Sequence, residues 1–94
     1  MALGGLWESW TAPDGTVLRT VCIVTTAANE LMVPIHERMP VIISPERWQD
    51  WLAAPVERID GLLEPYRSSD MHTWPVSRRV SRATEVGAEL LERL

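Results

Sequence analysis

The chain has 94 residues, of which 9 are Lys or Arg and 13 are Asp or Glu, giving a net charge of −4. This length allows one domain at most, and a chain this short buries only about 60–65% of the surface it exposes when unfolded. Hydrophobic residues make up 46% and charged residues 23%, which is the globular average and excludes wholesale disorder. The acidic balance argues against a self-sufficient nucleic-acid-binding protein, which normally carries a strongly basic surface.

The sequence contains no stretch of the ~18 consecutive apolar residues typical of a transmembrane helix. Residues 1–7 have neither the basic start nor the long apolar run of a signal peptide. The single cysteine, Cys22, allows no internal disulfide and no cysteine-based zinc cluster. We therefore expect a reduced, cytoplasmic protein with no membrane segment, no metal and no cofactor.

The first expected elements form a β-hairpin. Residues 6–10 are typical of a short strand, and residues 16–26 are rich in β-branched residues, as in a buried strand. Between them, residues 12–15 (APDG) form a turn sequence, because Pro and Asp favour the bend and Gly can adopt a positive φ. The edge of the first strand carries Trp7 and Trp10 and has no neighbour close in sequence to protect it.

Shorter elements follow the hairpin. Ser44 is a typical helix N-cap, with Pro45 at the first helical position. The sequence also predicts, in chain order, a helical turn at 27–32, a polar corner at 36–40, a buried strand at 41–43, a helix with Trp48, Trp51 and Leu52 on one face, a second helix from Pro55, a loop at 64–70, an extended stretch at 71–80 and a C-terminal helix at 84–94. These elements predict a mixed α+β fold with a mainly antiparallel sheet and short helices.

Two residue types are expected to be buried. Cys22 lies inside the apolar run at residues 21–24, which favours a packing role over a reactive thiol. The five tryptophans are spread along the chain, and we expect most of them to pack in or beside the core.

The densest group of candidate functional residues lies around His36 and Arg38. Histidine gains and loses protons near neutral pH, so His36 could act as a general acid and base, although a lone histidine in a turn is usually structural. Arg38 would point to the same side of an extended segment and could contact an anion. The alternative for Arg38 is a surface ion pair with Glu37 or Glu30. The second histidine, His72, has no neighbouring ligand set for a metal.

One stretch, residues 76–82, is locally basic, with three arginines and no acid. In an extended conformation, Arg78, Val80 and Arg82 would face one side, and such a row of arginines could face a phosphate backbone. The alternative is a solvated edge strand whose charges protect it from aggregation.

Four segments occur in an order that is similar to one known family: GLWE (residues 5–8), IVTTAAN (residues 23–29), IHERMPVII (residues 35–43) and WPVSRRV (residues 74–80), with GAELL (residues 87–91) behind them. Together they resemble the C-terminal part of the SOS response-associated peptidase (SRAP) domain of abasic-site processing proteins. The resemblance covers essentially all 94 residues, and the IHxRMP block is its most specific element.

The resemblance implies an activity on abasic sites in single-stranded DNA. In that family an N-terminal cysteine attacks the ring-opened sugar, and its amine and thiol form a thiazolidine crosslink with help from an Asn, a Glu and a His. The same machinery is credited with autoproteolytic removal of a short leader. Matching the motif positions implies catalytic roles for His36 and Thr25 and a DNA-phosphate contact for Arg38.

The sequence also departs from the family pattern. Residue 2 is Ala rather than Cys, and neither Glu8 nor Cys22 matches the catalytic Glu or the nucleophile of the family. We therefore expect residues 1–94 to be a partial SRAP domain that forms no crosslink alone, with abasic single-stranded DNA as its partner. A separate polypeptide carrying the N-terminal half could complete it. The alternatives are a non-catalytic fragment for single-stranded DNA binding or protein interaction, and the product of a degenerating gene.

Overall fold

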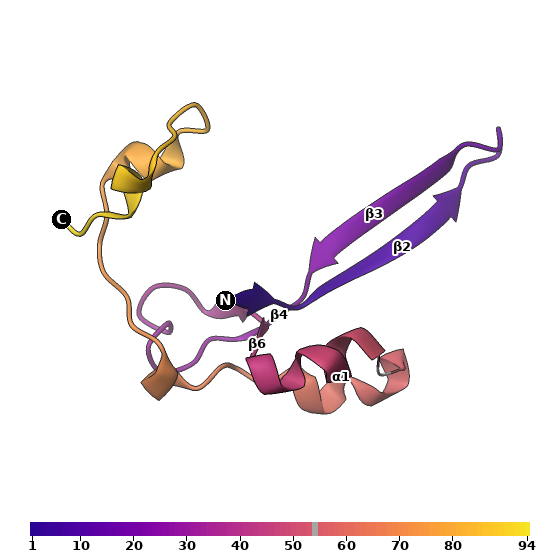
Figure 1. The fold of residues 1–94 in the computed structure, drawn as a ribbon, viewed down its shortest axis with the longest axis horizontal. Helices are drawn as coiled ribbons and strands as arrows, with labels where there is room; N and C mark the ends of the chain where they lie inside the picture. Colours follow the sequence, from indigo (N-terminus) through magenta and orange to yellow (C-terminus); the bar gives the residue numbers. More distant parts are fainter. Residues whose placement is uncertain (54) are drawn as a thin grey trace.

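A computed structural model describes residues 1–53 and 55–94 of the chain. It contains three two-stranded antiparallel sheets with short helices around them, which confirms the predicted α+β class (Figure 1). The strand pairs are β1 (Ala2–Leu3) with β6 (Ile42–Ile43), β2 (Gly5–Thr11) with β3 (Val17–Ile23), and β4 (Thr25–Ala27) with β5 (Arg38–Pro40).

The three sheets meet at a junction of Gly4, Val24 and Val41. Gly4 separates β1 from β2, Val24 separates β3 from β4, and Val41 separates β5 from β6. The two strands on either side of each of these residues pair with different partners. Their backbones form a closed ring of hydrogen bonds: the Gly4 N–H donates to the Val41 carbonyl at 2.7 Å, the Val41 N–H to the Val24 carbonyl at 2.9 Å, and the Val24 N–H to the Gly4 carbonyl at 2.9 Å. The single strand predicted over residues 16–26 is therefore two strands, because the chain changes partner at Val24.

The predicted hairpin is confirmed. Its turn is closed by the Gly15 N–H, which donates to the Ala12 carbonyl at 2.9 Å, and Gly15 adopts a φ of 88° as the turn requires. Asp14 supports the same turn by accepting a hydrogen bond from the Thr16 N–H at 2.9 Å.

The helix predicted after Ser44 begins there as a 3₁₀ turn, η1 (Pro45–Arg47), and continues as α1 (Trp48–Ala53). Two indole N–H groups attach it to the sheets: Trp48 Nε1 donates to the Ile43 carbonyl at 2.8 Å, and Trp51 Nε1 donates to the Gly5 carbonyl at 3.0 Å. Leu52, predicted on the same face, is 78% exposed instead.

The rest of the chain forms only isolated 3₁₀ turns. The predicted second helix is η2 (Val56–Arg58) and η3 (Asp60–Leu62), the predicted loop contains η4 (Ser68–Asp70), the predicted extended stretch ends in η5 (Arg78–Ser81), and the predicted C-terminal helix is reduced to η6 (Ala88–Leu91). Frequent Gly and Pro explain these short elements, since both residues interrupt helices.

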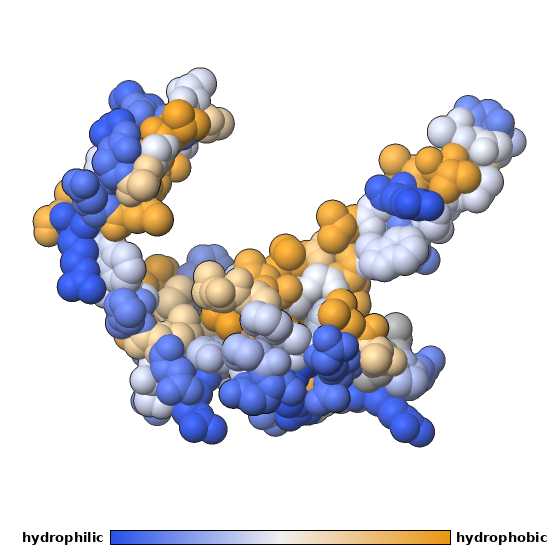
Figure 2. All heavy atoms as spheres, in the orientation of Figure 1, coloured by the Kyte–Doolittle hydropathy of each residue, from blue (hydrophilic) through white to orange (hydrophobic). Residues whose placement is uncertain are grey.

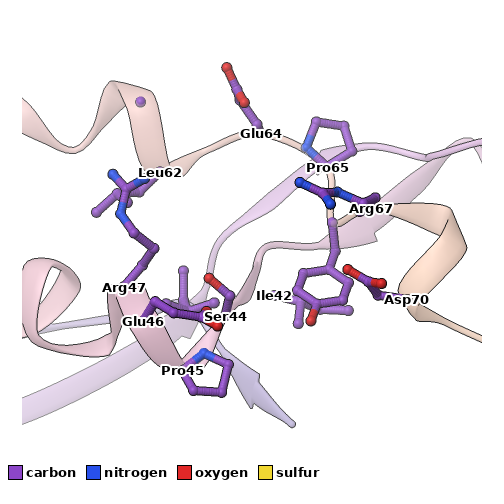
Figure 3. Close-up of a pocket in the computed structure, with 13 residues that line it drawn as sticks. Ile42, Ser44, Pro45, Glu46, Arg47, Leu62, Glu64, Pro65, Arg67 and Asp70 are labelled. Carbon is purple, nitrogen blue, oxygen red and sulfur yellow. The ribbon is translucent and has the colours of Figure 1, made fainter.

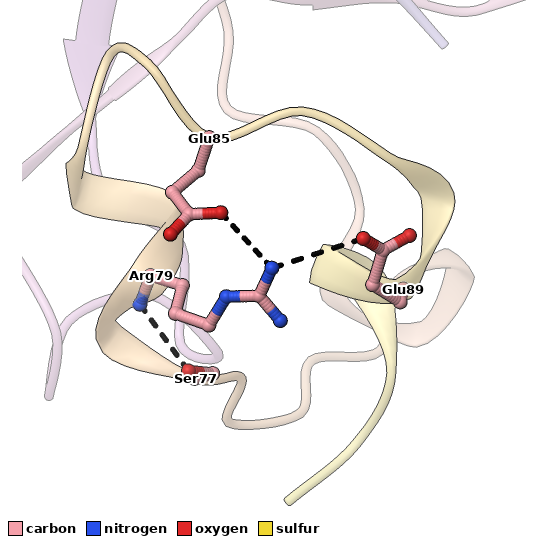
Figure 4. Close-up of polar contacts among 4 residues, drawn as sticks. All are labelled: Ser77, Arg79, Glu85 and Glu89. Carbon is pink, nitrogen blue, oxygen red and sulfur yellow. Dashed lines mark hydrogen bonds and ion pairs between the residues drawn. The ribbon is translucent and has the colours of Figure 1, made fainter.

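The C-terminal segment is held to itself by side chains (Figure 4). The Ser77 hydroxyl accepts a hydrogen bond from the Arg79 N–H at 3.2 Å and so begins η5. The Arg79 guanidinium pairs with Glu85 at 2.9 Å and reaches Glu89 at 3.8 Å. Trp74 Nε1 donates to the Leu91 carbonyl at 2.8 Å, which ties the end of the chain back to residue 74.

The molecule is open rather than compact. Its radius of gyration is 16.9 Å, whereas a folded domain of this length has a value of about 12 Å. The β2–β3 hairpin projects away from the junction, and the C-terminal segment lies at the opposite end of the molecule (Figure 1). Hydrophobic side chains lie on the surface of the hairpin and along the middle of the molecule (Figure 2).

The core is small. Within the described residues, the buried apolar side chains are those of Met39, Val41, Ile43 and Ile59. The expected burial of Cys22 is wrong, because every residue of β3 is exposed, Cys22 included. The expected packing of most tryptophans is also wrong, because four of the five are exposed: Trp7 at 72%, Trp10 at 56%, Trp48 at 43% and Trp74 at 37%. No helix in the described part of the chain is long and apolar enough to cross a membrane.

Candidate functional site

The β4–β5 sheet brings Thr25 and Arg38 together. Ala27 lies opposite Arg38 and Thr25 lies opposite Pro40 in this pair. Arg38 Nη2 reaches along the sheet and donates to both the carbonyl of Thr25 at 3.0 Å and its Oγ1 at 3.1 Å. The strand β5, which the sequence predicted as a polar corner, is therefore the element that positions the guanidinium.

His36 is held by the backbone of Arg38. The Arg38 N–H donates to His36 Nδ1 at 3.0 Å, so in the neutral ring Nδ1 is the acceptor and the proton sits on Nε2. The same Nδ1 lies 3.1 Å from the Arg38 carbonyl, which accepts a hydrogen bond when Nδ1 is protonated. One residue therefore provides a partner for the ring in both of its protonation states.

All three side chains are exposed, so a ligand can reach them. Arg38 makes no ion pair with any carboxylate of residues 1–53 and 55–94, which rules out the alternative pairing with Glu37 or Glu30 in this structure. The hydrogen bonds of its guanidinium within that part of the chain use Nη2 alone and go to neutral acceptors. The positive charge of Arg38 is thus oriented without being neutralised, which suits contact with an anion.

Asn29 organises the loop that leads to His36, and the residue-by-residue reading of the sequence missed it. Its Oδ1 accepts from the Met32 N–H at 3.0 Å, and its Nδ2 donates to the Tyr66 carbonyl at 2.7 Å. The Met32 carbonyl in turn accepts from the His36 N–H at 2.9 Å. The signal was available, because Asn commonly hydrogen-bonds to the backbone of the turn that follows it.

A large groove of about 630 Å³ lies away from these three residues and is lined by residues of the ranges 42–47 and 61–70 (Figure 3). Its lining mixes Arg47 and Arg67 with Glu46, Glu64 and Asp70, and contains none of the three predicted site residues. Arg47 is already paired with Asp50 at 2.9 Å. With more acids than arginines on its walls, this groove is poorly suited to nucleic-acid phosphate.

The basic stretch at residues 76–82 does not have the predicted extended arrangement. Residues 78–81 form the turn η5, so neither the phosphate-facing row nor the edge strand exists there. Arg79 is paired with Glu85 and Glu89, which neutralises one of the three charges. His72 stacks on Trp74 with ring centroids 5.1 Å apart. In the part of the chain that the structure describes, no group of three or more His, Cys, Asp or Glu side chains is placed to hold a metal.

The model of the family described as SOS response associated peptidase (SRAP) matches residues 1–83. The chain belongs to this family. The match includes the strands and the loop that carry Thr25, His36 and Arg38, so the SRAP resemblance found in the sequence is confirmed.

Curated SRAP relatives are named abasic site processing proteins. YoqW of Bacillus subtilis is 40% identical over 97% of this chain and 42% of its own length. YedK of Escherichia coli is 34% identical over 74% of this chain and 33% of its own length. HMCES of Gallus gallus is 31% identical over 86% of this chain and 25% of its own length. The chain thus spans about two fifths or less of these relatives.

A crystal structure of a protein from Bacteroides thetaiotaomicron has the same fold. The two align with a TM-score of 0.81 and 22% identity, over 98% of this chain and 42% of that one. Nearly the whole SRAP segment therefore has the conformation of part of a chain more than twice as long.

Proposed function

We propose that residues 1–94 form the acid–base and phosphate-binding part of a site that processes abasic single-stranded DNA. The observation that carries the proposal is the connected group of His36, Arg38 and Thr25, exposed on one sheet and its preceding loop. Support comes from the SRAP family match and from relatives named abasic site processing proteins.

His36 acts as the proton shuttle. When an amine and a thiol add to the aldehyde of a ring-opened abasic sugar, the carbonyl oxygen must be protonated twice and leave as water, while the nitrogen and the sulfur each lose a proton. A histidine that is held in both protonation states can give and take these protons in turn. The product is a thiazolidine, and one water is released for each crosslink.

Arg38 binds a phosphate beside the abasic sugar, and Thr25 positions Arg38. A planar guanidinium can donate several hydrogen bonds to phosphate oxygens. Because Nη2 is hydrogen-bonded to Thr25, the remaining N–H groups of the guanidinium keep a defined direction. Binding the phosphate places the sugar near His36, since the backbone N–H of Arg38 holds the His36 ring at 3.0 Å.

The amine and the thiol come from the remaining part of the SRAP domain, which lies outside residues 1–94. The chain spans 42% of YoqW, and Cys22 lies on the projecting hairpin rather than in the His36 group. We therefore propose that residues 1–94 form no covalent adduct with abasic DNA alone. The cytoplasm, where thiols stay reduced, is the compartment that suits this chemistry.

DNA binding by matched arginine variants tests the proposal. The probe is a fluorescent single-stranded oligonucleotide with one abasic site, titrated at several salt concentrations. Arg38→Ala should weaken binding several-fold and lower the slope of log K against log salt by about 0.7. Arg67→Ala, an exposed arginine of the large groove, is the matched control and should change neither quantity. Equal effects of the two substitutions, or none from Arg38→Ala, would refute the role of Arg38.

A further inference from the structure

A pocket of about 390 Å³ gathers aromatic side chains beside the β1–β6 pair. The chain has five Trp, one Tyr and two His, and half of these residues line this one pocket. They come from three separate parts of the chain: Trp48, Tyr66, His72 and Trp74. We call this surface the aromatic pocket. Its volume and its ring-lined wall suit a small planar ligand.

Two indoles of the aromatic pocket are fixed by their N–H groups. Trp48 Nε1 donates to the Ile43 carbonyl and Trp74 Nε1 to the Leu91 carbonyl, each at 2.8 Å. The single polar group of each side chain is thereby satisfied, and the ring face is the part left to bind a ligand. The two side chains are 43% and 37% exposed. Because these rings are already held in place, stacking a planar ligand on them costs little side-chain freedom.

Trp74 already takes part in stacking. The ring of His72 lies on it with centroids 5.1 Å apart and an angle of 23° between the planes, and the Arg93 guanidinium carbon lies 4.8 Å from the centre of the indole. All three residues are exposed. A further planar ring can therefore extend this stack, as bases do on aromatic side chains in proteins that bind single strands.

We propose that the aromatic pocket binds an unpaired nucleobase of single-stranded DNA by stacking on the pair of His72 and Trp74. Charge decides which part of a nucleotide enters. The Asp70 carboxylate lines the pocket and makes no ion pair within the described residues, so it repels a phosphate and admits the neutral base. A small organic cation fits less well, because Arg93 already places a positive charge over the Trp74 ring.

Asn29 connects the aromatic pocket to the loop that carries His36. Its Nδ2 donates to the Tyr66 carbonyl at 2.7 Å and to Met71 Sδ at 3.3 Å, and both partners line the pocket. Its Oδ1 holds the turn whose carbonyl accepts from the His36 N–H. The inference rests on the proposed function in one respect, namely that the base belongs to the strand whose phosphate Arg38 binds.

Two oligonucleotides of equal length and charge test the pocket. One carries normal bases around a single abasic site, and the other is abasic at every position. The strand with bases should bind residues 1–94 at least fivefold more tightly. His72→Ala and Trp74→Ala should each weaken its binding at least fivefold and leave binding of the strand without bases unchanged. Trp74→Phe keeps a ring but loses the bond to Leu91, and should keep the preference for bases.

The matched control is Trp10→Ala, which removes an exposed tryptophan of the hairpin and should change neither affinity. A fluorescent base, 2-aminopurine, placed beside the abasic site reports stacking itself. Its emission should fall on binding to the unmodified protein and stay constant with His72→Ala. Equal affinity for the two strands, or an unchanged preference in both alanine variants, would overturn the pocket.

Competitors identify the occupant. A free deoxynucleoside monophosphate that binds as tightly as the strand, or choline chloride that displaces the strand more than an equal concentration of sodium chloride, would overturn the assignment to a base of single-stranded DNA.

The outcomes also separate this inference from the proposed function. Arg38→Ala should weaken binding of both strands by the same factor, because both carry phosphates. A preference for bases that depends on His72, together with no effect of Arg38→Ala, would refute the proposed site and leave the aromatic pocket standing. The reverse result would refute the aromatic pocket alone.

Discussion

One guanidinium nitrogen of Arg38 donates two hydrogen bonds to Thr25, to the carbonyl at 3.0 Å and to Oγ1 at 3.1 Å. The two residues are 13 positions apart in the sequence and lie on the paired strands β4 and β5. This contact fixes the direction of the arginine, while the backbone of the same residue holds the ring of His36 at 3.0 Å. The three predicted site residues are thus linked through Arg38.

Replacing Thr25 by Val removes Oγ1 and keeps the shape of the side chain. The Arg38 guanidinium then has only the carbonyl of residue 25 to hold it, so we expect affinity for abasic single-stranded DNA to fall by about two- to fivefold, in line with the loss of one hydrogen bond. Thr25→Ser restores the hydroxyl and should recover the affinity. Fluorescence anisotropy at fixed salt measures the change, and equal affinity of the Val and Thr proteins would show that Thr25 does not position Arg38.

Asn29→Ala should loosen the loop before His36. The substitution removes the acceptor for the Met32 N–H and the donor to the Tyr66 carbonyl in a half-buried place, so we expect a loss of about 1–3 kcal/mol in the free energy of unfolding. Amide hydrogen exchange should speed up over residues 30–36, and the turn at Gly15 should exchange as before. Unchanged exchange in the loop would contradict this role.

A methyl group added at Gly4 would enter the junction of the three sheets. Its Cβ would lie 2.9 Å from Trp51 Cη2 and 3.3 Å from Val41 Cγ1, so Gly4→Ala should cost about 1–3 kcal/mol of stability. Gly61→Ala is the control, because a Cβ there meets nothing within 4 Å. Urea denaturation of both variants measures the change. Equal denaturation midpoints for the two variants would contradict the prediction.

Asp14 makes the hairpin turn sensitive to acid. The hydrogen bonds that its carboxylate accepts from the Thr16 backbone and then from the Thr16 side chain hold the pKa of Asp14 below its usual value of 3.8. Because the folded pKa is depressed, this stabilisation is present above pH 3.8 and is lost as the pH falls through the lowered value. The Thr16 amide resonance should therefore be constant from about pH 5 to pH 8 and move at lower pH. In Asp14→Asn that movement should disappear.

Local sequence signals predicted the hairpin and the start of the helix after Ser44, because each depends on a few adjacent residues. The strands β1 and β5 could not be predicted in this way, since Ala2 pairs with Ile43 and the two strands have only two and three residues. The β-branched residues around Cys22 indicated a strand correctly. They did not reveal that this strand is exposed along its whole length in the described part of the chain.

The candidate site was predictable in part. His36 and Arg38 are close in the sequence, and their residue types indicated acid–base chemistry and anion binding without further information. The role of Thr25 came from the family resemblance, because a contact between strands β4 and β5 cannot be recognised from the spacing of neighbouring residues. Asn29 was missed because only one of its partners, Met32, is close in the sequence, whereas Tyr66 lies 37 residues further along the chain.

Covalent capture of abasic single-stranded DNA, followed on a denaturing gel, tests the proposed site most directly. The part of Bacillus subtilis YoqW outside its match to this chain is added as a separate, complementing polypeptide. In its presence we expect an adduct that forms at least 100-fold more slowly in His36→Gln, which loses the proton shuttle but keeps an acceptor for the Arg38 N–H. Without the complementing polypeptide, we expect no adduct. An adduct formed by residues 1–94 alone, or at the same rate in His36→Gln, would contradict the proposed division of the site.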